Sequence, residues 1–140
     1  MIIQSVLDMI NKDKITKENI NKIIDYIPYF EDKDSKFYSI SKTDIIYPYL
    51  YSKEVHDFER LLYDEKIILV FDWGEWQPEA VKIFDNPDLL ANADLETLRK
   101  LLTLHIRKER FYSGHLADMI KSGHILNILR RLKEISISMV

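Results

Sequence analysis

Apolar side chains recur at steps of three and four residues along most of the chain, which is the spacing of one face of an α-helix. The densest such run spans residues 94–132. It predicts a central helix from residue 95 to about residue 111, with Asp94 as its N-cap and its leucines facing inward. Gly114 is placed to end this helix, and a short helix that follows would stop at Gly123, ahead of a last helix.

Four more helices are predicted ahead of this run, three of them before residue 65. Residues 2–10 have the pattern of a short amphipathic helix, and Thr16 is a suitable N-cap for a second helix that Pro28 would end. These two helices are able to pack as an antiparallel hairpin. Ser52 is a suitable N-cap for the third helix, which we expect to end near residue 64.

The helical period is lost in two other stretches. Residues 29–51 are rich in tyrosine, and we interpret them as an irregular strap over the core, with the floor of a ligand groove as the alternative. Residues 67–71 form a short apolar run that fits either a buried strand or a turn of helix. Pro78 suits the first turn of a further helix.

These patterns predict a mainly α protein. We expect one domain over residues 1–140, a bundle of about six or seven helices in which the helix from residue 95 is central, with either a short strand or a turn of helix near residues 67–71. Residues 1–51 would form the helical hairpin and the strap, and residues 52–134 the core. No repeat, low-complexity tract or linker indicates a second domain.

Composition narrows the class of protein. With 46% hydrophobic and 31% charged residues over 140 positions, the chain is suited to a globular core and not to disorder. Its longest apolar run, residues 67–71, is too short to cross a bilayer, and the N-terminus does not resemble a signal peptide. The chain has no cysteine, which excludes thiolate catalysis and cysteine zinc sites and fits a cytoplasmic location.

The net charge of −3 hides an uneven distribution. Residues 1–98 carry eleven Lys and Arg against twenty Asp and Glu, whereas residues 99–140 carry nine against three. Either the two parts dock on each other, which we favour, or the basic part faces an anionic partner.

Several short motifs resemble those of a family of small bacterial proteins to which no activity is assigned. The motifs are Phe71-Asp72-Trp73 with Trp76, the run from Ala93 to Leu98, Arg107 with Arg110-Phe111 and Gly114-His115, and the run from Ile128 to Leu132. The similarity covers approximately residues 52–134. It implies a bacterial cytoplasmic protein and does not imply a catalytic activity.

One set of residues is a candidate binding site at the end of the central helix. It combines two cations, a histidine, a carboxylate and an aromatic wall: Arg107, Arg110, His115, Asp72, Trp73 and Trp76. Guanidinium groups bind phosphate and carboxylate through paired hydrogen bonds, so this corner would accept an anion, with His115 as a hydrogen-bond donor. The structural alternative is that the arginines pair with Asp72 or Glu109 and cap helix carbonyls.

Nucleic-acid binding is a second hypothesis. The basic residues of the last third could form a phosphate-binding stripe, and the last two helices have the spacing of a helix-turn-helix. The residues are Arg99, Lys100, Arg107, Lys108, Arg110, Lys121, Arg130, Arg131 and Lys133. The isoelectric point near 5.8 argues against a dedicated nucleic-acid-binding protein.

Catalytic and metal chemistry find little support in the sequence. His105, His115 and His124 are nine or ten residues apart, without zinc-binding spacing, and His105 is expected to be a hydrogen-bonded core residue. The three glycines form no phosphate loop, and no nucleophile elbow occurs. We assign no catalytic residue, cofactor or metal. We expect a protein that binds a partner, a protein or a second copy of itself, with an enzyme acting on a small anionic substrate as the alternative.

Overall fold

The computed structural model describes residues 3–11 and 14–140, and helices make up 62% of it. The prediction of a mainly α fold is confirmed. The helices are α1 (Gln4–Ile10), α2 (Lys17–Ile24), α3 (Ile27–Glu31), α4 (Lys53–Asp64), α5 (Trp73–Asp85), α6 (Pro87–Ala91), α7 (Leu95–Lys108), α8 (His115–Lys121) and α9 (His124–Ile137). Two short strands, β1 (Tyr38–Ile40) and β2 (Tyr49–Tyr51), form an antiparallel hairpin. None of the described helices has the length and apolar character needed to cross a membrane.

Helix starts follow the polar residues that the sequence marks as N-caps. The Ser52 side chain accepts a hydrogen bond from the Val55 N–H, and the Asp94 carboxylate accepts one from the Thr97 N–H. Thr16 forms a reciprocal capping box with Asn19. Because each of these side chains satisfies a backbone donor that the helix leaves unpaired, the helix begins at a defined residue.

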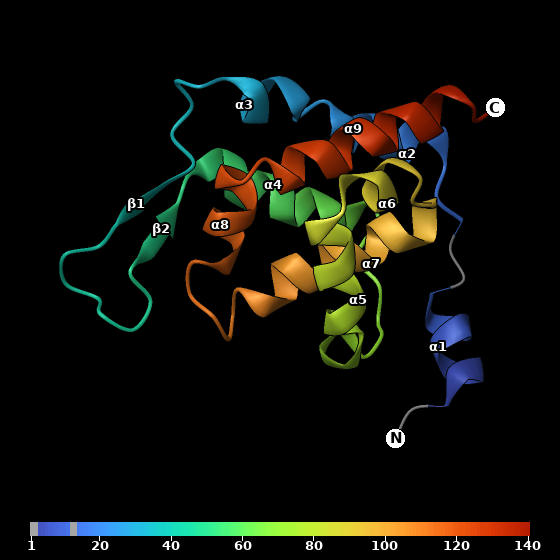
Figure 1. Cartoon of the computed structure of the whole chain (residues 1–140), viewed down its shortest axis with the longest axis horizontal. Coiled ribbons are helices and arrows are strands. Elements are labelled where there is room, and N and C mark those ends of the chain that lie inside the picture. The colour runs from blue at the N-terminus through green and yellow to red at the C-terminus, as the bar shows by residue number, and fades with distance from the viewer. Residues whose placement is uncertain (1–2, 12–13) are drawn as a thin grey trace.

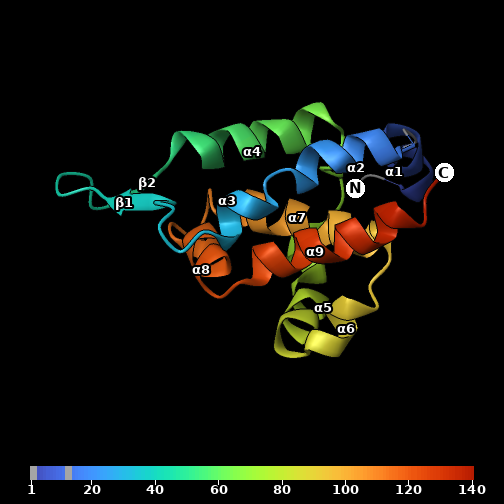
Figure 2. The same ribbon diagram turned by 90° about the horizontal axis from the view of Figure 1, so that it is seen from above.

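The core lies around α7 and α9, which pack against each other; in Figure 1, α9 runs above α7. Helix α9 packs against α2, α3, α6, α7 and α8, while α5 packs against α6 and α7. Leu98, Leu101 and Leu102 of α7 are fully buried, as the central-helix prediction requires. Seen from above, α4 lies on one side of α7 and α9, and α5 with α6 lies on the other (Figure 2).

The β1–β2 hairpin projects from one end of the helical body (Figures 1 and 2). Tyr38 pairs with Tyr51, and Ile40 pairs with Tyr49. At the far end of the hairpin, Ile45 is 91% exposed and Ile46 is 71% exposed. Within the predicted strap, residues 29–31 belong to α3, and residues 38–51 form a hairpin that projects from the helical body instead of lying over the core.

Prolines shift two helix boundaries from their predicted places. Helix α2 ends at Ile24, and Pro28 lies in the first turn of the separate helix α3, where its missing N–H costs nothing. Helix α5 begins at Trp73, so Pro78 lies inside it. Pro78 has no N–H to donate to the Gly74 carbonyl. That carbonyl accepts a hydrogen bond from the Gln77 side chain instead. The described residues form nine helices, whereas six or seven were predicted. The short helices α3 and α6 make up the difference.

Two local predictions are wrong. Residues 67–71 form neither a strand nor a turn of helix, the two structures that their apolar run fits, and within this irregular segment the buried N–H of Leu69 is satisfied by the Thr103 hydroxyl. A side chain from α7 therefore replaces the strand partner that this segment lacks. Helix α1 buries none of its residues and does not form a packed hairpin with α2, although Asn11 exchanges two hydrogen bonds with the Val70 backbone.

Candidate functional site

The predicted corner is not assembled around Asp72. Its carboxylate accepts a hydrogen bond from the Glu75 N–H and caps α5. Among the described residues, no ion pair joins Asp72 to Arg107 or to Arg110. Asp72 is thus a helix-capping residue, because its position just before Trp73 places the carboxylate over the first free N–H groups of the helix.

The two tryptophans pack against different partners. The Trp73 ring lies 5.8 Å from that of Phe111, whereas the Trp76 ring lies 6.0 Å from that of Phe71. The Lys100 ammonium group lies over both Phe71 and Trp76, at 5.8 and 5.9 Å from the ring centroids. This is a cation–π arrangement between α5 and α7, which joins the two helices through packing.

The side chains of Arg107 and Arg110 lie in different surroundings. Arg107 is partly buried, and its Nε has no hydrogen-bond partner among the described residues. Arg110 is exposed and lines a different pocket, with Tyr49 and Glu59, at the base of the hairpin. The His115 side chain makes no hydrogen bond to Arg107 or Arg110 among the described residues. It hydrogen-bonds to His105 instead. The six predicted residues therefore do not form one site.

Three histidines meet where α5, α7, α8 and α9 come together, and we call them the histidine cluster: His105, His115 and His124. His105 Nδ1 lies 2.9 Å from His115 Nε2, and the His105 and His124 ring centroids are 5.0 Å apart. The expectation that His105 is a hydrogen-bonded core residue is confirmed, since it is 3% exposed. The Nε2 atoms of His105 and His124 are buried without a hydrogen-bond partner among the described residues.

Burial keeps the histidine cluster neutral. It lowers the pKa of His124 to about 4, and burial together with nearby Lys108 lowers the pKa of His115 to about 4. Burial and the other two histidines hold the pKa of His105 well below its usual value. A charged imidazolium in this apolar setting would lose its hydration, and two protonated rings would leave the His105–His115 hydrogen bond without an acceptor.

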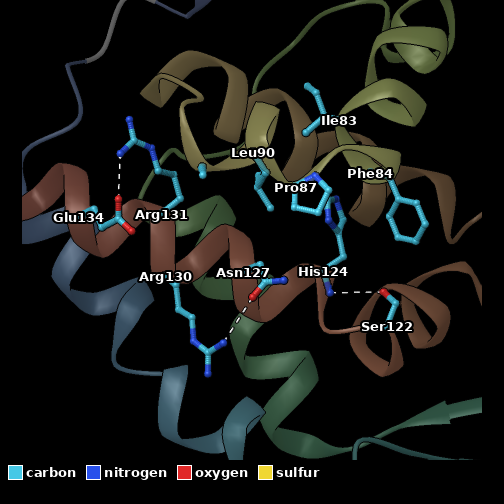
Figure 3. A pocket seen from close by; sticks show the side chains of 11 residues that line it. Ile83, Phe84, Pro87, Leu90, Ser122, His124, Asn127, Arg130, Arg131 and Glu134 are labelled. Carbon is cyan, nitrogen blue, oxygen red and sulfur yellow. Dashed lines mark hydrogen bonds and ion pairs between the residues drawn. The ribbon is translucent and has the colours of Figure 1, made fainter.

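His124 also lines the pocket that we call the α9 pocket, a hollow of about 470 Å³ between α9 and the α5–α6 junction (Figure 3). Its apolar wall consists of Ile83, Phe84, Pro87 and Leu90. Its polar wall consists of Ser122, His124, Asn127, Arg130, Arg131 and Glu134. In Figure 3 the His124 ring rises from α9 toward Pro87 and Phe84.

The arginines of the α9 pocket are held differently. Arg131 is half-buried; its Nε donates to the Ala93 carbonyl and its Nη1 lies 3.0 Å from Glu134. The Arg130 guanidinium pairs with Glu31 and donates to Asn127. The side chains of Glu134 and Glu31 are 63% and 46% exposed, so both ion pairs are surface pairs of low energy, typically below 1 kcal/mol.

Glu109 fixes the connection between α7 and α8. Its carboxylate accepts hydrogen bonds from the Tyr51 hydroxyl at 2.8 Å and from the backbone N–H groups of Gly114 and Leu116. The Tyr51 hydroxyl oxygen accepts the Ala117 N–H in turn. Burial and the adjacent carboxylate raise the pKa of Tyr51, so the phenol keeps the proton that this network needs. The hairpin is thereby tied to the start of α8.

The basic residues of the nucleic-acid hypothesis do not share a common environment. Arg99 donates to the backbone carbonyls of Lys66 and Ile67, Lys100 lies over aromatic rings, and Lys108 lies over Tyr112. Arg130 and Arg131 each have a carboxylate beside them, as described above. The remaining exposed lysines, Lys121 and Lys133, lie on α8 and α9.

Sequence reasoning missed the residues that meet only in the folded chain. The histidine spacing of nine and ten gave no sign of clustering, because Gly114 and Gly123 reverse the chain between successive helices. Asn127 and Glu109 gave no signal beyond helical spacing. No group of three or more His, Asp or Glu side chains in the described part of the chain is arranged to hold a metal ion.

Comparison with known proteins identifies a family and no closer relative. No curated protein and no solved structure matches the chain. The model of one family matches residues 15–138, so the family domain begins before α2 and includes the hairpin as well as the segment from residue 52. The chain therefore belongs to the family described as a family of unknown function, DUF6508.

Proposed function

We propose that this chain is a small bacterial, cytoplasmic binding protein whose α9 pocket accepts a small organic anion with an apolar body. The observation that carries the proposal is the pairing of an apolar wall with the guanidinium groups of Arg130 and Arg131 around one hollow. The volume of about 470 Å³ lies within the range of small-molecule sites. The anion-binding chemistry expected at Arg107 and Arg110 is thus proposed for Arg130 and Arg131.

Arg131 is the anchor of the proposed site. Its bond to the Ala93 carbonyl orients the guanidinium group before a ligand arrives, which reduces the entropy lost on binding. The exposed Glu134 partner is weakly held, so a ligand carboxylate could displace it at little cost.

Benzoate is a suitable probe, because it combines an apolar ring with one carboxylate. We expect benzoate to shift the amide resonances of α6 and of the first half of α9 in two-dimensional NMR titrations. Arg131→Gln should weaken binding about tenfold, since one charge-assisted hydrogen bond contributes about 1.5 kcal/mol. Lys133→Gln is the matched control, because Lys133 lies on the same helix outside the pocket and should leave binding unchanged.

Benzyl alcohol separates charge recognition from simple burial of a ring. It has nearly the same shape as benzoate without the charge, and we expect it to bind more weakly. Equal binding of both compounds, or equal benzoate affinity of the parent protein and Arg131→Gln, would refute anion recognition in this pocket.

The hairpin supports a second candidate function, association with another copy of the chain. Ile40, Ile45, Ile46 and Leu50 are each more than half exposed on a segment that projects from the body. Clustered exposed apolar side chains of this kind commonly mark protein interfaces. We expect light scattering to show a mass that rises with protein concentration, and the double variant Ile45→Ser and Ile46→Ser to remain monomeric. A parent protein that stays monomeric at all concentrations would refute self-association.

Nucleic-acid binding is not proposed. A phosphate-binding face needs adjacent cations without carboxylates between them. Glu31 and Glu134 lie beside the two arginines of α9, and Arg99 is directed to backbone carbonyls. The apolar face of α9 is buried against five other helices, so this helix carries the core as well as its exposed basic side chains.

A further inference from the structure

A second pocket lies at the base of the hairpin, on the side of α7 that faces α4. We call it the tyrosine pocket, and its volume is about 230 Å³. Its lining residues are Tyr47, Tyr49, Tyr51, His56, Glu59, Tyr63, Ile106, Glu109, Arg110 and Ser113. His56, Glu59 and Tyr63 are three and four residues apart on α4, so they share one face of that helix.

The two carboxylates of the tyrosine pocket differ in their surroundings. Glu109 is saturated by the Tyr51 hydroxyl and by two backbone N–H groups, so its negative charge is already compensated. Glu59 is half-buried, and no hydrogen bond or ion pair reaches its carboxylate from residues 3–11 or 14–140. Burial raises the pKa of Glu59, while nearby His56 lowers it. This carboxylate is the group to which a cation would bind.

Arg110 provides the opposite charge at the same pocket. Its side chain is exposed, and it makes no hydrogen bond or ion pair with any described residue. Arg110 and Glu59 are close enough to influence each other electrostatically, yet they form no ion pair within 4.0 Å. An unpaired carboxylate and an unpaired guanidinium therefore face one hollow, separated by a gap.

The tyrosine rings complete a site for an organic cation. The Tyr49 and Tyr51 rings are stacked with centroids 6.4 Å apart, and Tyr47 and Tyr63 add two more rings to the lining. The negative faces of aromatic rings attract ammonium groups, most of all when a carboxylate is nearby. A volume of about 230 Å³ equals roughly seven or eight water molecules, which suits a compact ligand.

We infer that the tyrosine pocket binds a small zwitterion, a molecule whose ammonium group is held by Glu59 and the tyrosine rings and whose carboxylate is held by Arg110. The ligand bridges two opposite charges that the chain leaves apart. This site shares no residue with the α9 pocket, so it stands independently of the anion-binding proposal.

Trimethylglycine and 4-(trimethylammonio)butyrate are the probes, since they carry the two charges at short and longer spacing. We expect at least one of them to shift the amide resonances of Glu59, Tyr63, Arg110 and Ser113 in NMR titrations. Tetramethylammonium and acetate, each with one of the two charges, should bind at least tenfold more weakly. Tetramethylammonium binding as tightly as the better zwitterion would overturn the inference.

Variants test the two charged contacts separately. Glu59→Gln and Arg110→Gln should each weaken binding of the better zwitterion about tenfold or more, in proteins whose thermal unfolding remains cooperative. Glu54→Gln is the matched control, because Glu54 lies exposed on the same helix outside the pocket. Arg110 is exposed, so its variant tests the inference even if Glu59→Gln fails to fold. Unchanged affinity in Arg110→Gln, or no shift with either zwitterion, would refute the assignment.

Discussion

Gly114→Ala is expected to lower the free energy of unfolding by about 2–4 kcal/mol, while Gly123→Ala should lower it by only about 1 kcal/mol. Both glycines have positive φ, at 94° and 82°, so alanine meets similar backbone strain at either position. A Cβ at Gly114 would lie 2.5 Å from the Tyr49 ring, whereas a Cβ at Gly123 would meet nothing within 4 Å. Gly123→Ala therefore isolates the contribution of the Tyr49 contact.

Urea denaturation of the three proteins measures this difference. In Gly114→Ala the Tyr49 ring has to move, and because Tyr49 belongs to β2, we expect faster amide hydrogen exchange across the hairpin. The same loss of stability in both variants would show that the ring moves aside without cost. The hairpin would then be less tightly docked on the α7–α8 connection than the structure indicates.

The histidine cluster is expected to make the protein acid-sensitive between about pH 6.5 and pH 4. In the folded protein the pKa values of His115 and His124 are about 4 and the pKa of His105 lies well below its usual value, whereas in the unfolded chain all three titrate near 6.5. The unfolded state therefore binds more protons below pH 6.5, and the free energy of unfolding falls as the pH falls through this window. Each buried histidine contributes up to about 1.4 kcal/mol per pH unit.

Between pH 7 and pH 5 the free energy of unfolding should fall by about 4 kcal/mol. This figure is lower than three fully buried histidines would give, because His115 is partly open to solvent. Urea denaturation at stepped pH values measures it. His124→Phe keeps a ring against Phe84, removes the unpartnered Nε2 and should reduce the loss by about 2 kcal/mol. A parent protein equally stable at pH 7 and pH 5 would contradict buried neutral histidines.

Helix starts and the central helix were predictable because their causes are local. Ser52 and Asp94 accept hydrogen bonds from N–H groups three residues ahead, and Leu98, Leu101 and Leu102 follow the helical period. Helix α3 was missed because Pro28 at the start of a helix looks, in sequence alone, like a proline that ends one.

The candidate sites were less predictable because they depend on contacts between distant parts of the chain. Asp72 looked like an ion-pair partner but is a helix cap, a role that depends on α5 starting at Trp73 and not near Pro78. His115 was expected to donate a hydrogen bond to an anion beside the arginines, whereas its hydrogen-bond partner in the structure is His105. Glu59 had no distinguishing signal, because its lack of a partner is a property of the folded surface.

By itself, the sequence determined the mainly α class, most helix starts and the burial of α7, since hydrophobic period and capping act within a few residues. Only the tertiary structure decided which polar groups meet. It brought together His105, His115 and His124, and it left Glu59 and Arg110 unpaired beside the same hollow. Those arrangements depend on how helices cross and where the hairpin docks, and both are set by packing between segments far apart in the chain.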